Sequence, residues 1–282
     1  MSQSTASPGV AARMGNGTHP KIDIAAISVK YGDTTVVKDL SIQVNAGEVL
    51  SVIGGSGCGK TTLLHVVAGL VPSAEGHVYV DGTIIDGPGR DRVMVFQDDA
   101  VFPWMTVRRN VEYGLRTTAM DREARDEVVD RILAMVGLKG RGHLLPRQLS
   151  GGMRKRVDVA RALAVEPQIL LMDEPYASLD AMTKERLQDE FMRIHSRARM
   201  TVLFVTHDLE EALFVGDRVA IMGTSPGHLS SLLDVPLTRP RAPEIKRSLE
   251  FQALRGELDA RLQAAGVELR AASETSGEGS MP

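Results

Sequence analysis

Apolar residues follow two different spacings along this chain, and the two spacings alternate. Short runs that are apolar or rich in β-branched residues are typical of strands, and segments with an apolar residue every three or four positions are typical of helices. The runs expected to form strands are residues 21–31, 36–44, 48–54, 76–86 (with a turn at Asp81-Gly82), 92–96, 169–172, 201–205 and 218–222. The segments expected to form helices are residues 60–70, 121–136, 154–164, 180–197 and 209–215. Strands that alternate with helices predict an α/β fold with a mostly parallel sheet.

The stretch over residues 98–164 breaks this alternation. Val129, Ile132 and Leu133 share one helical face, and Gly137 stands where a glycine often ends a helix. We therefore expect a helical subdomain over residues 98–164, inserted into the α/β domain.

The two ends of the chain have a different composition from the middle. Residues 1–20 and 271–282 are rich in Ser, Gly and Ala, and we expect both to be disordered tails. The α/β domain is expected to span residues 21–250 and to include an extended, proline-rich strap at 236–243. A closing helix is expected at 251–262, before the second tail.

The charge and cysteine content exclude several classes of protein. The 282 residues include 33 Lys or Arg and 36 Asp or Glu, which gives a net charge of −3. This balance excludes a generally basic surface of the kind that coats nucleic acid. The single cysteine, Cys58, excludes an intramolecular disulfide and a cysteine-rich zinc site. No apolar run approaches the roughly 18 residues of a membrane-spanning helix, so we expect any membrane connection to run through a protein partner.

One glycine-rich loop carries the strongest chemical signal. Residues 54–61, Gly-Gly-Ser-Gly-Cys-Gly-Lys-Thr, fit G-x-x-x-x-G-K-[ST] and stand between an expected strand and an expected helix. Glycines allow backbone N–H groups to converge on phosphates without a clash from Cβ atoms. Lys60 is expected to reach the β- and γ-phosphates of a nucleotide, and the Thr61 hydroxyl to bind Mg²⁺. Cys58 is expected to have no chemical role, with a reactive thiol as the alternative.

Two carboxylates follow a continuous apolar run. Residues 169–172 predict a strand buried on both faces, and Asp173 and Glu174 come directly after it. Ligands bind at the carboxyl edge of open parallel sheets, where these side chains would emerge. Asp173 is expected to hold Mg²⁺, and Glu174 to orient or deprotonate an attacking water. In isolation the pair would be a solvated cap on a strand.

A second anion site is predicted at residues 149–153, Leu-Ser-Gly-Gly-Met. Ser150, Gly151 and Gly152 stand at the start of an expected helix, where free N–H groups and the helix dipole favour anions. One nucleotide does not need two such sites on one chain, so we expect this one to serve the nucleotide held by a second copy. The alternative is an ordinary helix N-cap with a turn.

Together, these motifs resemble the nucleotide-binding subunit of an ATP-binding cassette (ABC) transporter over residues 21–222. The positions that carry the resemblance are Tyr31 (adenine-stacking aromatic), 54–61 (Walker A), Gln97 (Q-loop), 149–153 (signature), 169–174 (Walker B), 178–180 (D-loop) and His207 (switch histidine). The resemblance implies a P-loop NTPase fold of the ABC cassette type. Such a fold has a mostly parallel, RecA-like core sheet, an antiparallel β subdomain and an inserted helical subdomain.

The resemblance also implies a role for each position. It implies catalytic roles for Glu174, His207 and Gln97, and Mg²⁺ ligation by Thr61, Gln97 and Asp173. The residues that it implies for ATP binding are Tyr31, Gly54, Gly55, Ser56, Gly57, Cys58, Gly59, Lys60, Thr61, Thr62, Ser150, Gly151, Gly152 and Asp180.

Four of these roles rest on the whole set of motifs. Tyr31 would stack on adenine, Gln97 would sense the attacking water, His207 would donate to the γ-phosphate, and Asp180 would order the interface between two copies. Taken singly, the four positions have ordinary interpretations. They are a tyrosine in the core, a polar loop residue, a histidine that caps a helix, and a helix N-cap.

Several positions separate this chain from the commonest family pattern. Met153 and Lys155 stand where glutamine is frequent. Met153 and residues 95–104 (VFQDDAVFPW) resemble the importer branch for nitrate, sulfonate and taurine, in which the aromatic-Pro-Trp region faces the membrane subunit. For Trp104, a buried anchor of the helical subdomain is the alternative. Tyr176-Ala177-Ser178 departs from the Phe-Gly-Ala common in that branch.

The resemblance implies an ATP-hydrolysing importer subunit that uses ATP and Mg²⁺. It implies a head-to-tail homodimer, two transmembrane permease subunits, an indirectly associated solute-binding protein, and a peripheral location on the cytoplasmic face of the inner membrane. The implied cargo is a small anionic solute, with lipid or another solute as the alternative. A DNA- or ribosome-associated ATPase is disfavoured because the 89 residues from Lys60 to Leu149 contain no sustained heptads, and no nucleic-acid partner is expected.

Overall fold

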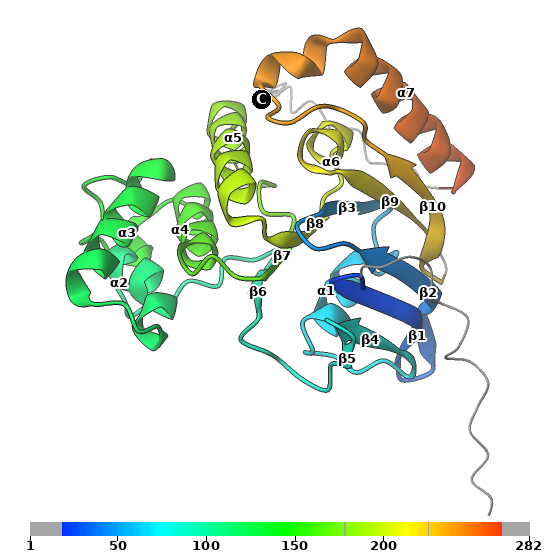
Figure 1. Ribbon diagram of the computed structural model, residues 1–282, viewed down its shortest axis with the longest axis horizontal. Helices are drawn as coiled ribbons and strands as arrows, with labels where there is room; N and C mark the ends of the chain where they lie inside the picture. Colours follow the sequence, from blue (N-terminus) through cyan, green and yellow to red (C-terminus); the bar gives the residue numbers. More distant parts are fainter. Residues whose placement is uncertain (1–18, 178, 225, 267–282) are drawn as a thin grey trace, which may run out of the picture.

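The computed structural model describes residues 19–177, 179–224 and 226–266 (Figure 1). Nearly all of the first expected tail, the whole of the second and Ser178 of the D-loop motif lie outside these residues. The described elements form an α/β core, a smaller antiparallel sheet and a lateral group of helices (Figure 1).

A six-stranded sheet forms the core, with the strand order β10-β9-β3-β8-β7-β6. Its strands are β3 (Val49–Gly54), β6 (Arg92–Val95), β7 (Ile169–Asp173), β8 (Thr201–Val205), β9 (Arg218–Gly223) and β10 (His228–Asp234). The first five are parallel, and only β10 pairs antiparallel, at the edge. The central strands β3, β7 and β8 are buried throughout, as continuous apolar runs predict. The sequence analysis missed β10, because polar residues interrupt its apolar pattern.

The second sheet is antiparallel and has the order β2-β1-β4-β5. It contains β1 (Ile22–Tyr31), β2 (Thr34–Val44), β4 (Glu75–Val80) and β5 (Thr83–Ile84). Asp81 and Gly82 form the turn between β4 and β5, both with positive φ, as the sequence predicts for this dipeptide. The predicted combination of a mostly parallel core sheet with an antiparallel sheet is confirmed.

Helix α1 (Lys60–Val67) packs between the two sheets and ends earlier than residue 70, its predicted end. Gly69 follows with a φ of +75°, and a Cβ atom at this position would lie 2.2 Å from the Gly87 carbonyl oxygen. The left-handed conformation of Gly69 ends the helix, and the close Gly87 carbonyl leaves no room for a side chain at this position.

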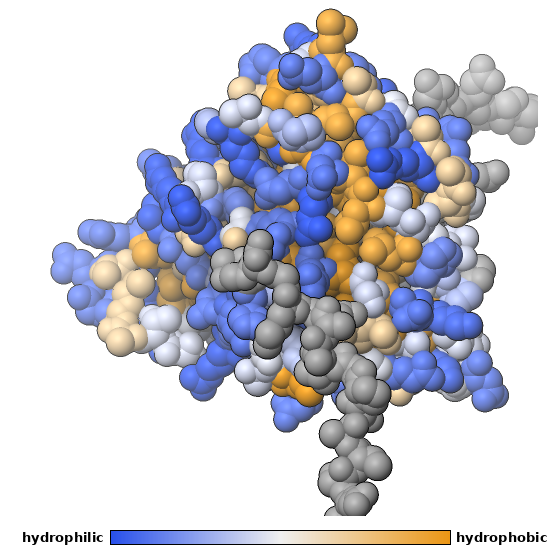
Figure 2. All heavy atoms as spheres, turned by 45° about the vertical axis from the view of Figure 1, so that its right-hand side comes forward, coloured by the Kyte–Doolittle hydropathy of each residue, from blue (hydrophilic) through white to orange (hydrophobic). Residues whose placement is uncertain are grey.

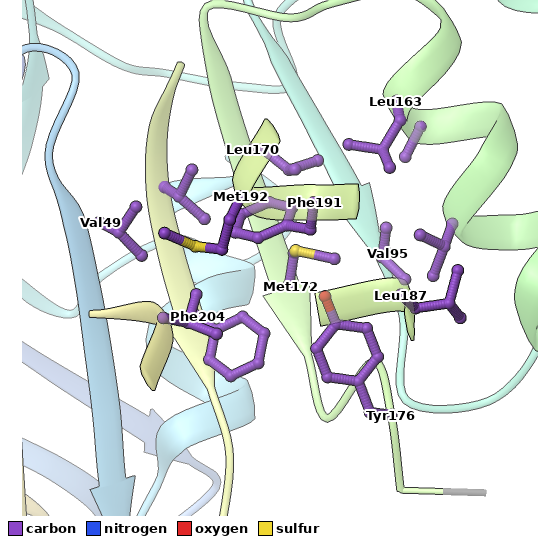
Figure 3. Close-up of a cluster of buried hydrophobic side chains, with 14 of the residues drawn as sticks. Val49, Val95, Leu163, Leu170, Met172, Tyr176, Leu187, Phe191, Met192 and Phe204 are labelled. Carbon is purple, nitrogen blue, oxygen red and sulfur yellow. The ribbon is translucent and has the colours of Figure 1, made fainter. Parts of the chain in front are cut away.

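Alternate residues of the core strands face two separate apolar clusters. On β7, Ile169 and Leu171 pack with α1 and the antiparallel sheet. Leu170 and Met172 face the opposite side, where they join the cluster shown in Figure 3 with Tyr176 and residues from the helices. The sheet is thus covered on both faces, which holds its carboxyl edge in a fixed geometry.

The helices between β6 and β7 lie to one side of the core (Figure 1). They are α2 (Val107–Glu112), η1 (Gly114–Thr117), α3 (Arg122–Met135), η2 (Pro146–Gln148) and α4 (Gly151–Ala164). Asp121 caps α3 by accepting a hydrogen bond from the Ala124 N–H at 2.8 Å, and the predicted face with Val129, Ile132 and Leu133 is buried. Helix α2 was not predicted, since six residues are too short for a clear apolar period.

The remaining helices are α5 (Ala181–Ala198), α6 (Leu209–Val215), η3 (Pro243–Arg247) and α7 (Leu249–Ala264). Helix α7 confirms the closing helix, and Phe251, Leu258 and Leu262 are its buried residues. The strap before η3 is held by the buried Arg241, whose guanidinium donates to carbonyls at the end of α6, including those of Leu213 and Gly216. The strap therefore closes the C-terminal end of α6.

Across the described residues, no helix is both long enough and apolar enough to span a bilayer. Figure 2 shows one face of the molecule, on which hydrophilic residues surround a central band of apolar ones.

Candidate nucleotide-binding site

The glycine-rich loop joins the carboxyl end of β3 to the first turn of α1. A Cβ atom on Gly54 would lie 2.7 Å from the Met222 carbonyl oxygen, and one on Gly59 would lie 2.6 Å from Cγ2 of Val37. Gly59 also has a φ of +92°, which a residue with a side chain rarely adopts. Glycine is thus required at both ends of the loop, where β9 and β2 press against it.

Lys60 lies folded over this loop. It is buried, and its ammonium donates to the Gly54 carbonyl at 2.8 Å and to the Gly55 carbonyl at 2.9 Å. Helix α1 starts at Lys60, so its free N–H groups and its positive dipole end face the loop. The loop can therefore present a fixed cation and backbone donors to the phosphates of a nucleotide.

The Cys58 thiol points into the protein. Its side chain is buried, and burial raises the pKa of the thiol despite the nearby Lys60 ammonium. A thiol with a raised pKa is rarely in its nucleophilic thiolate form, so the structure disfavours the reactive-cysteine alternative.

Asp173 ends β7 at the same edge of the sheet. Its side chain is buried, and neither carboxylate oxygen has a hydrogen-bond partner among the residues that the structure describes. Burial raises the pKa of Asp173, an effect that the neighbouring Thr61 hydroxyl opposes. A buried, unpartnered carboxylate beside a hydroxyl is a donor set that suits a hard divalent cation. Asp173 and Thr61 thus fit the predicted Mg²⁺ site.

Glu174 and His207 form a pair across the ends of β7 and β8. Nδ1 of His207 lies 3.2 Å from Oε2 of Glu174, and the Glu174 N–H donates to the Val205 carbonyl. The bond to His207 lowers the pKa of Glu174, and the same bond raises the pKa of His207. Glu174 therefore stays ionised near neutral pH, as a general base requires. Its φ of +44° is an uncommon backbone conformation for a residue with a side chain.

A partly buried network of charged and polar side chains holds the segment around His207. Glu211 accepts a hydrogen bond from the Thr206 hydroxyl and an ion pair from Lys184 of α5 at 2.6 Å. Lys184 also pairs with Asp208, which caps α6 by accepting from the Glu210 N–H. Sequence reasoning missed Lys184, because its partners lie more than 20 residues further along the chain.

Gln97 comes two residues after Val95, which pairs in register with Met172 of β7. Neighbouring parallel strands therefore bring Gln97 and Asp173 to the same sheet edge. The Gln97 carbonyl accepts a hydrogen bond from Lys155 of α4 at 2.8 Å. Burial lowers the pKa of Lys155, although nearby carboxylates, led by Asp158, favour its charged form.

Tyr31 ends β1 and leaves half of its surface exposed. The alternative of a tyrosine buried in the core is therefore wrong, and the ring is free to accept a flat partner. The adjoining strand β2 contacts the phosphate loop through Val37 and Gly59.

Ser150 and Asp180 are both helix N-caps. The Ser150 hydroxyl accepts a hydrogen bond from the Met153 N–H at 3.3 Å, and the Asp180 carboxylate accepts one from the Thr183 N–H at 3.0 Å, which lowers the pKa of Asp180. Helix α4, which Ser150 caps, packs with α2 and α3, whereas α1 packs with the sheets. The start of α4 and the phosphate loop thus belong to different parts of one chain (Figure 1).

Trp104 is an exposed residue. Its ring leaves 71% of its surface open and lies 5.6 Å from Phe102, whose ring in turn lies 4.7 Å from Tyr113. The alternative of a buried anchor for Trp104 is therefore wrong.

The fold and the loop together define a P-loop nucleotide-binding protein. Residues 37–177 match the protein family described as ABC transporter. The chain is 44% identical over 216 residues to the nitrate import ATP-binding protein NrtD of Synechococcus elongatus. The aligned residues make up 76% of this chain and 79% of that protein. It is 43% identical over 222 residues to the aliphatic sulfonates import ATP-binding protein SsuB 2 of Burkholderia cenocepacia. The aligned residues make up 79% of this chain and 81% of that protein.

A solved structure agrees with this match. The dimeric, post-hydrolysis ATP-binding cassette MJ0796 bound to ADP and Pi has a TM-score of 0.69 and 29% identity, and it covers 77% of this chain and 100% of that one. The chain belongs to the ABC transporter family as an ATP-binding subunit. The family resemblance seen in the sequence is thus confirmed.

Proposed function

We propose that this chain hydrolyses ATP to drive uptake of a small anionic solute, of the nitrate, sulfonate or taurine kind, through separate membrane subunits. The observation that supports it most is the arrangement at one sheet edge of a phosphate loop, a buried unpartnered carboxylate and a paired general base. The names of two relatives, a nitrate and an aliphatic sulfonate import protein, support the solute class.

The site residues divide the chemistry between them. Backbone N–H groups of residues 54–62 and the Lys60 ammonium bind the phosphates, and the Tyr31 ring stacks on the adenine. Thr61, Asp173 and the Gln97 amide would hold Mg²⁺, which when bound would neutralise charge on the phosphates.

Hydrolysis needs a positioned water rather than a covalent intermediate. Glu174 accepts the proton of this water while its oxygen bonds to the γ-phosphorus and the bond from that phosphorus to ADP breaks. His207, which lies 3.2 Å from Glu174, donates to the γ-phosphate.

A second copy completes each site. Ser150, Gly151 and Gly152 of one copy contact the ATP bound to residues 54–61 of the other, and Asp180 lies at the interface between them. The dimeric state of the solved cassette MJ0796 supports this arrangement. ATP then favours a closed dimer, because both copies contact it, and hydrolysis releases them.

The partners follow from this role. The dimer docks on two permease subunits at the cytoplasmic face of the inner membrane, where it lies peripherally, and a solute-binding protein delivers the cargo. The exposed ring of Trp104 and the half-buried ring of Phe102 beside it supply an aromatic surface for a permease. No nucleic acid takes part. The ATP-binding domain spans residues 21–250, with its helical subdomain over 98–164.

Substitution of Glu174 tests the proposal. We expect Glu174→Gln to lower kcat for ATP by at least about 100-fold, because the base is lost, while ATP binding stays within a few-fold of wild type. Analytical ultracentrifugation with Mg-ATP should then show a stable dimer. Glu185→Gln, on the exposed side of α5, is the control. Activity near wild type in Glu174→Gln would refute the assignment of the base.

The solute class needs a test in cells. Deletion of the gene should abolish growth on either nitrate or an aliphatic sulfonate as the single nitrogen or sulfur source. Unchanged growth on both would refute the solute class and leave the ATPase assignment standing.

A further inference from the structure

Three basic side chains attach the helix that follows Ser150 to the loop that carries Gln97. All three belong to α4, and their partners lie within residues 96–100. The contacts run from Lys155 to the Phe96 and Gln97 carbonyls, from Nε of Arg154 to Oδ2 of Asp99 at 2.7 Å, and from Arg161 to the Ala100 carbonyl at 2.7 Å. We call these three side chains the α4 clamp.

Lys155 is the innermost of the three. Its side chain is 2% exposed, and its ammonium donates to two consecutive backbone carbonyls, one of them that of Gln97 at 2.8 Å. A buried ammonium needs such acceptors, and the carbonyls of a loop need donors in turn. The contact therefore fixes the backbone from which the Gln97 side chain branches.

Several carboxylates surround this ammonium. Asp158 lies on its own helix, Asp98 and Asp99 lie on the Q-loop, and Asp173 lies at the end of β7. The positive charge of Lys155 also acts on Glu174, the proposed base. One buried cation thus joins the signature helix, the Q-loop and the carboxylates of the proposed Mg²⁺ site.

The two outer contacts extend the clamp toward the aromatic surface. The guanidinium of Arg161 lies 4.9 Å from the centre of the Phe102 ring, besides its bond to Ala100. Phe102 is itself held, since its N–H donates to the side chain of the buried Asn110 at 2.8 Å. Movement of α4 would therefore carry the whole segment from Phe96 to Phe102.

We propose that Lys155 is a positioning residue for Gln97, and that the α4 clamp makes the signature helix and the Q-loop move as one body. The inference rests on the proposed function, because it gives Lys155 an effect on Mg²⁺ and on the attacking water through Gln97. A contact between the start of α4 and the nucleotide bound to the second copy would then be transmitted through the α4 clamp to Ala100 and Phe102, next to the exposed Trp104. A glutamine at position 155 is shorter and uncharged, so it can supply only part of this link.

The test is Lys155→Met, which keeps the length and the apolar stem but removes the ammonium. We expect amide hydrogen exchange across residues 96–102 to become at least about tenfold faster, because two carbonyls lose their donor. We expect kcat to fall at least about tenfold and the Mg²⁺ concentration for half-maximal activity to rise, with ATP affinity changed less than about threefold. Lys155→Gln should restore part of the exchange protection and of the Mg²⁺ dependence.

Arg156→Met is the matched control. Arg156 is the next basic residue on α4 and is half-buried, but it donates to the Val136 carbonyl at 3.2 Å and not to the Q-loop. Exchange across residues 96–102 and the Mg²⁺ dependence should stay at wild-type values. Equal changes in Arg156→Met and Lys155→Met would overturn the proposal, as would wild-type exchange and Mg²⁺ dependence in Lys155→Met.

Two further outcomes keep the test decisive. If Lys155→Met does not fold, Lys155→Gln takes its place, and wild-type exchange together with wild-type Mg²⁺ dependence in that variant would count against the clamp. If the wild-type chain shows no ATPase activity, the proposed function fails. The exchange measurement on the same proteins still decides whether Lys155 holds the Q-loop.

Discussion

Lys184 joins the start of α5 to the start of α6, and its removal should be costly. Its ammonium lies 2.6 Å from Oε1 of Glu211 and 2.6 Å from Oδ2 of Asp208. Burial acts against its charge, yet these carboxylates raise the pKa of Lys184. In Lys184→Met, the buried Glu211 carboxylate would keep the Thr206 hydroxyl as its one partner among the residues that the structure describes.

The size of the loss follows from the burial of the pair. Removal of one member of a fully buried ion pair costs about 3–5 kcal/mol. Glu211 is nearly fully buried, but the side chain of Lys184 is 24% exposed, so we expect a loss of about 2–3 kcal/mol in the free energy of unfolding. For a chain of this size, the melting temperature should fall by about 3–6 °C.

The pH dependence gives a sharper test than the size of the loss. Burial raises the pKa of Glu211 above 4.5, and Lys184 opposes the rise. Without Lys184 the folded-state pKa should rise further. Since an acid with a raised folded pKa destabilises the protein once it ionises, the deficit of Lys184→Met should grow as the pH rises above about 4.5. Urea unfolding at pH 5 and at pH 8 would measure this difference.

Two variants complete the experiment. Arg193→Met lies on the same helix, but Arg193 is 63% exposed, so its loss should cost less than about 1 kcal/mol. The double variant Lys184→Met, Glu211→Gln should regain about half of the deficit, because the nearly fully buried carboxylate is then replaced by a neutral amide, while Asp208 still lacks its partner. The reasoning is refuted if Lys184→Met loses less than about 1 kcal/mol, or if its deficit is the same at both pH values.

Three further outcomes are expected. The His207–Glu174 pair should stabilise the fold most between about pH 4.5 and 6.5, where both are charged, and by less than about 1 kcal/mol since His207 is more than half exposed. This contribution should vanish as the pH rises through the raised pKa of His207. The check is to compare the melting temperatures of wild type and His207→Gln at pH 5.5 and at pH 9. The same melting-temperature difference at both pH values would contradict the expectation. Gly59→Ala should lower ATP affinity at least about tenfold in a calorimetric titration, because its methyl group would lie 2.6 Å from Val37 and distort the loop, whereas unchanged affinity would show that the loop tolerates a side chain. Arg241→Met should lower the unfolding free energy by about 2–5 kcal/mol in urea, because carbonyls at the end of α6 lose their donor, and a loss below about 1 kcal/mol would mean that water replaces the guanidinium.

Local signals in the sequence were sufficient for the elements and the motifs. The apolar runs of β3, β7 and β8 and the helical spacing of α3 were enough to predict these elements. A strand buried on both faces has a continuous apolar run, whereas a helix buried on one face has an apolar residue every three or four positions. The loop at residues 54–61 was equally clear, since only glycines tolerate its close contacts and positive φ values.

Contacts between distant residues could not be predicted in this way. The sequence left Trp104 either buried or exposed, and Lys155 was only a departure from a family pattern. Lys155 donates to the Gln97 carbonyl, Lys184 to Asp208 and Arg241 to the Leu213 carbonyl, and each of these partners lies at least 20 residues away along the chain. Amino-acid order determines which local elements form, because backbone geometry and apolar spacing act within a few residues. Which charge meets which carbonyl depends on how those elements pack, and only the tertiary structure decided that.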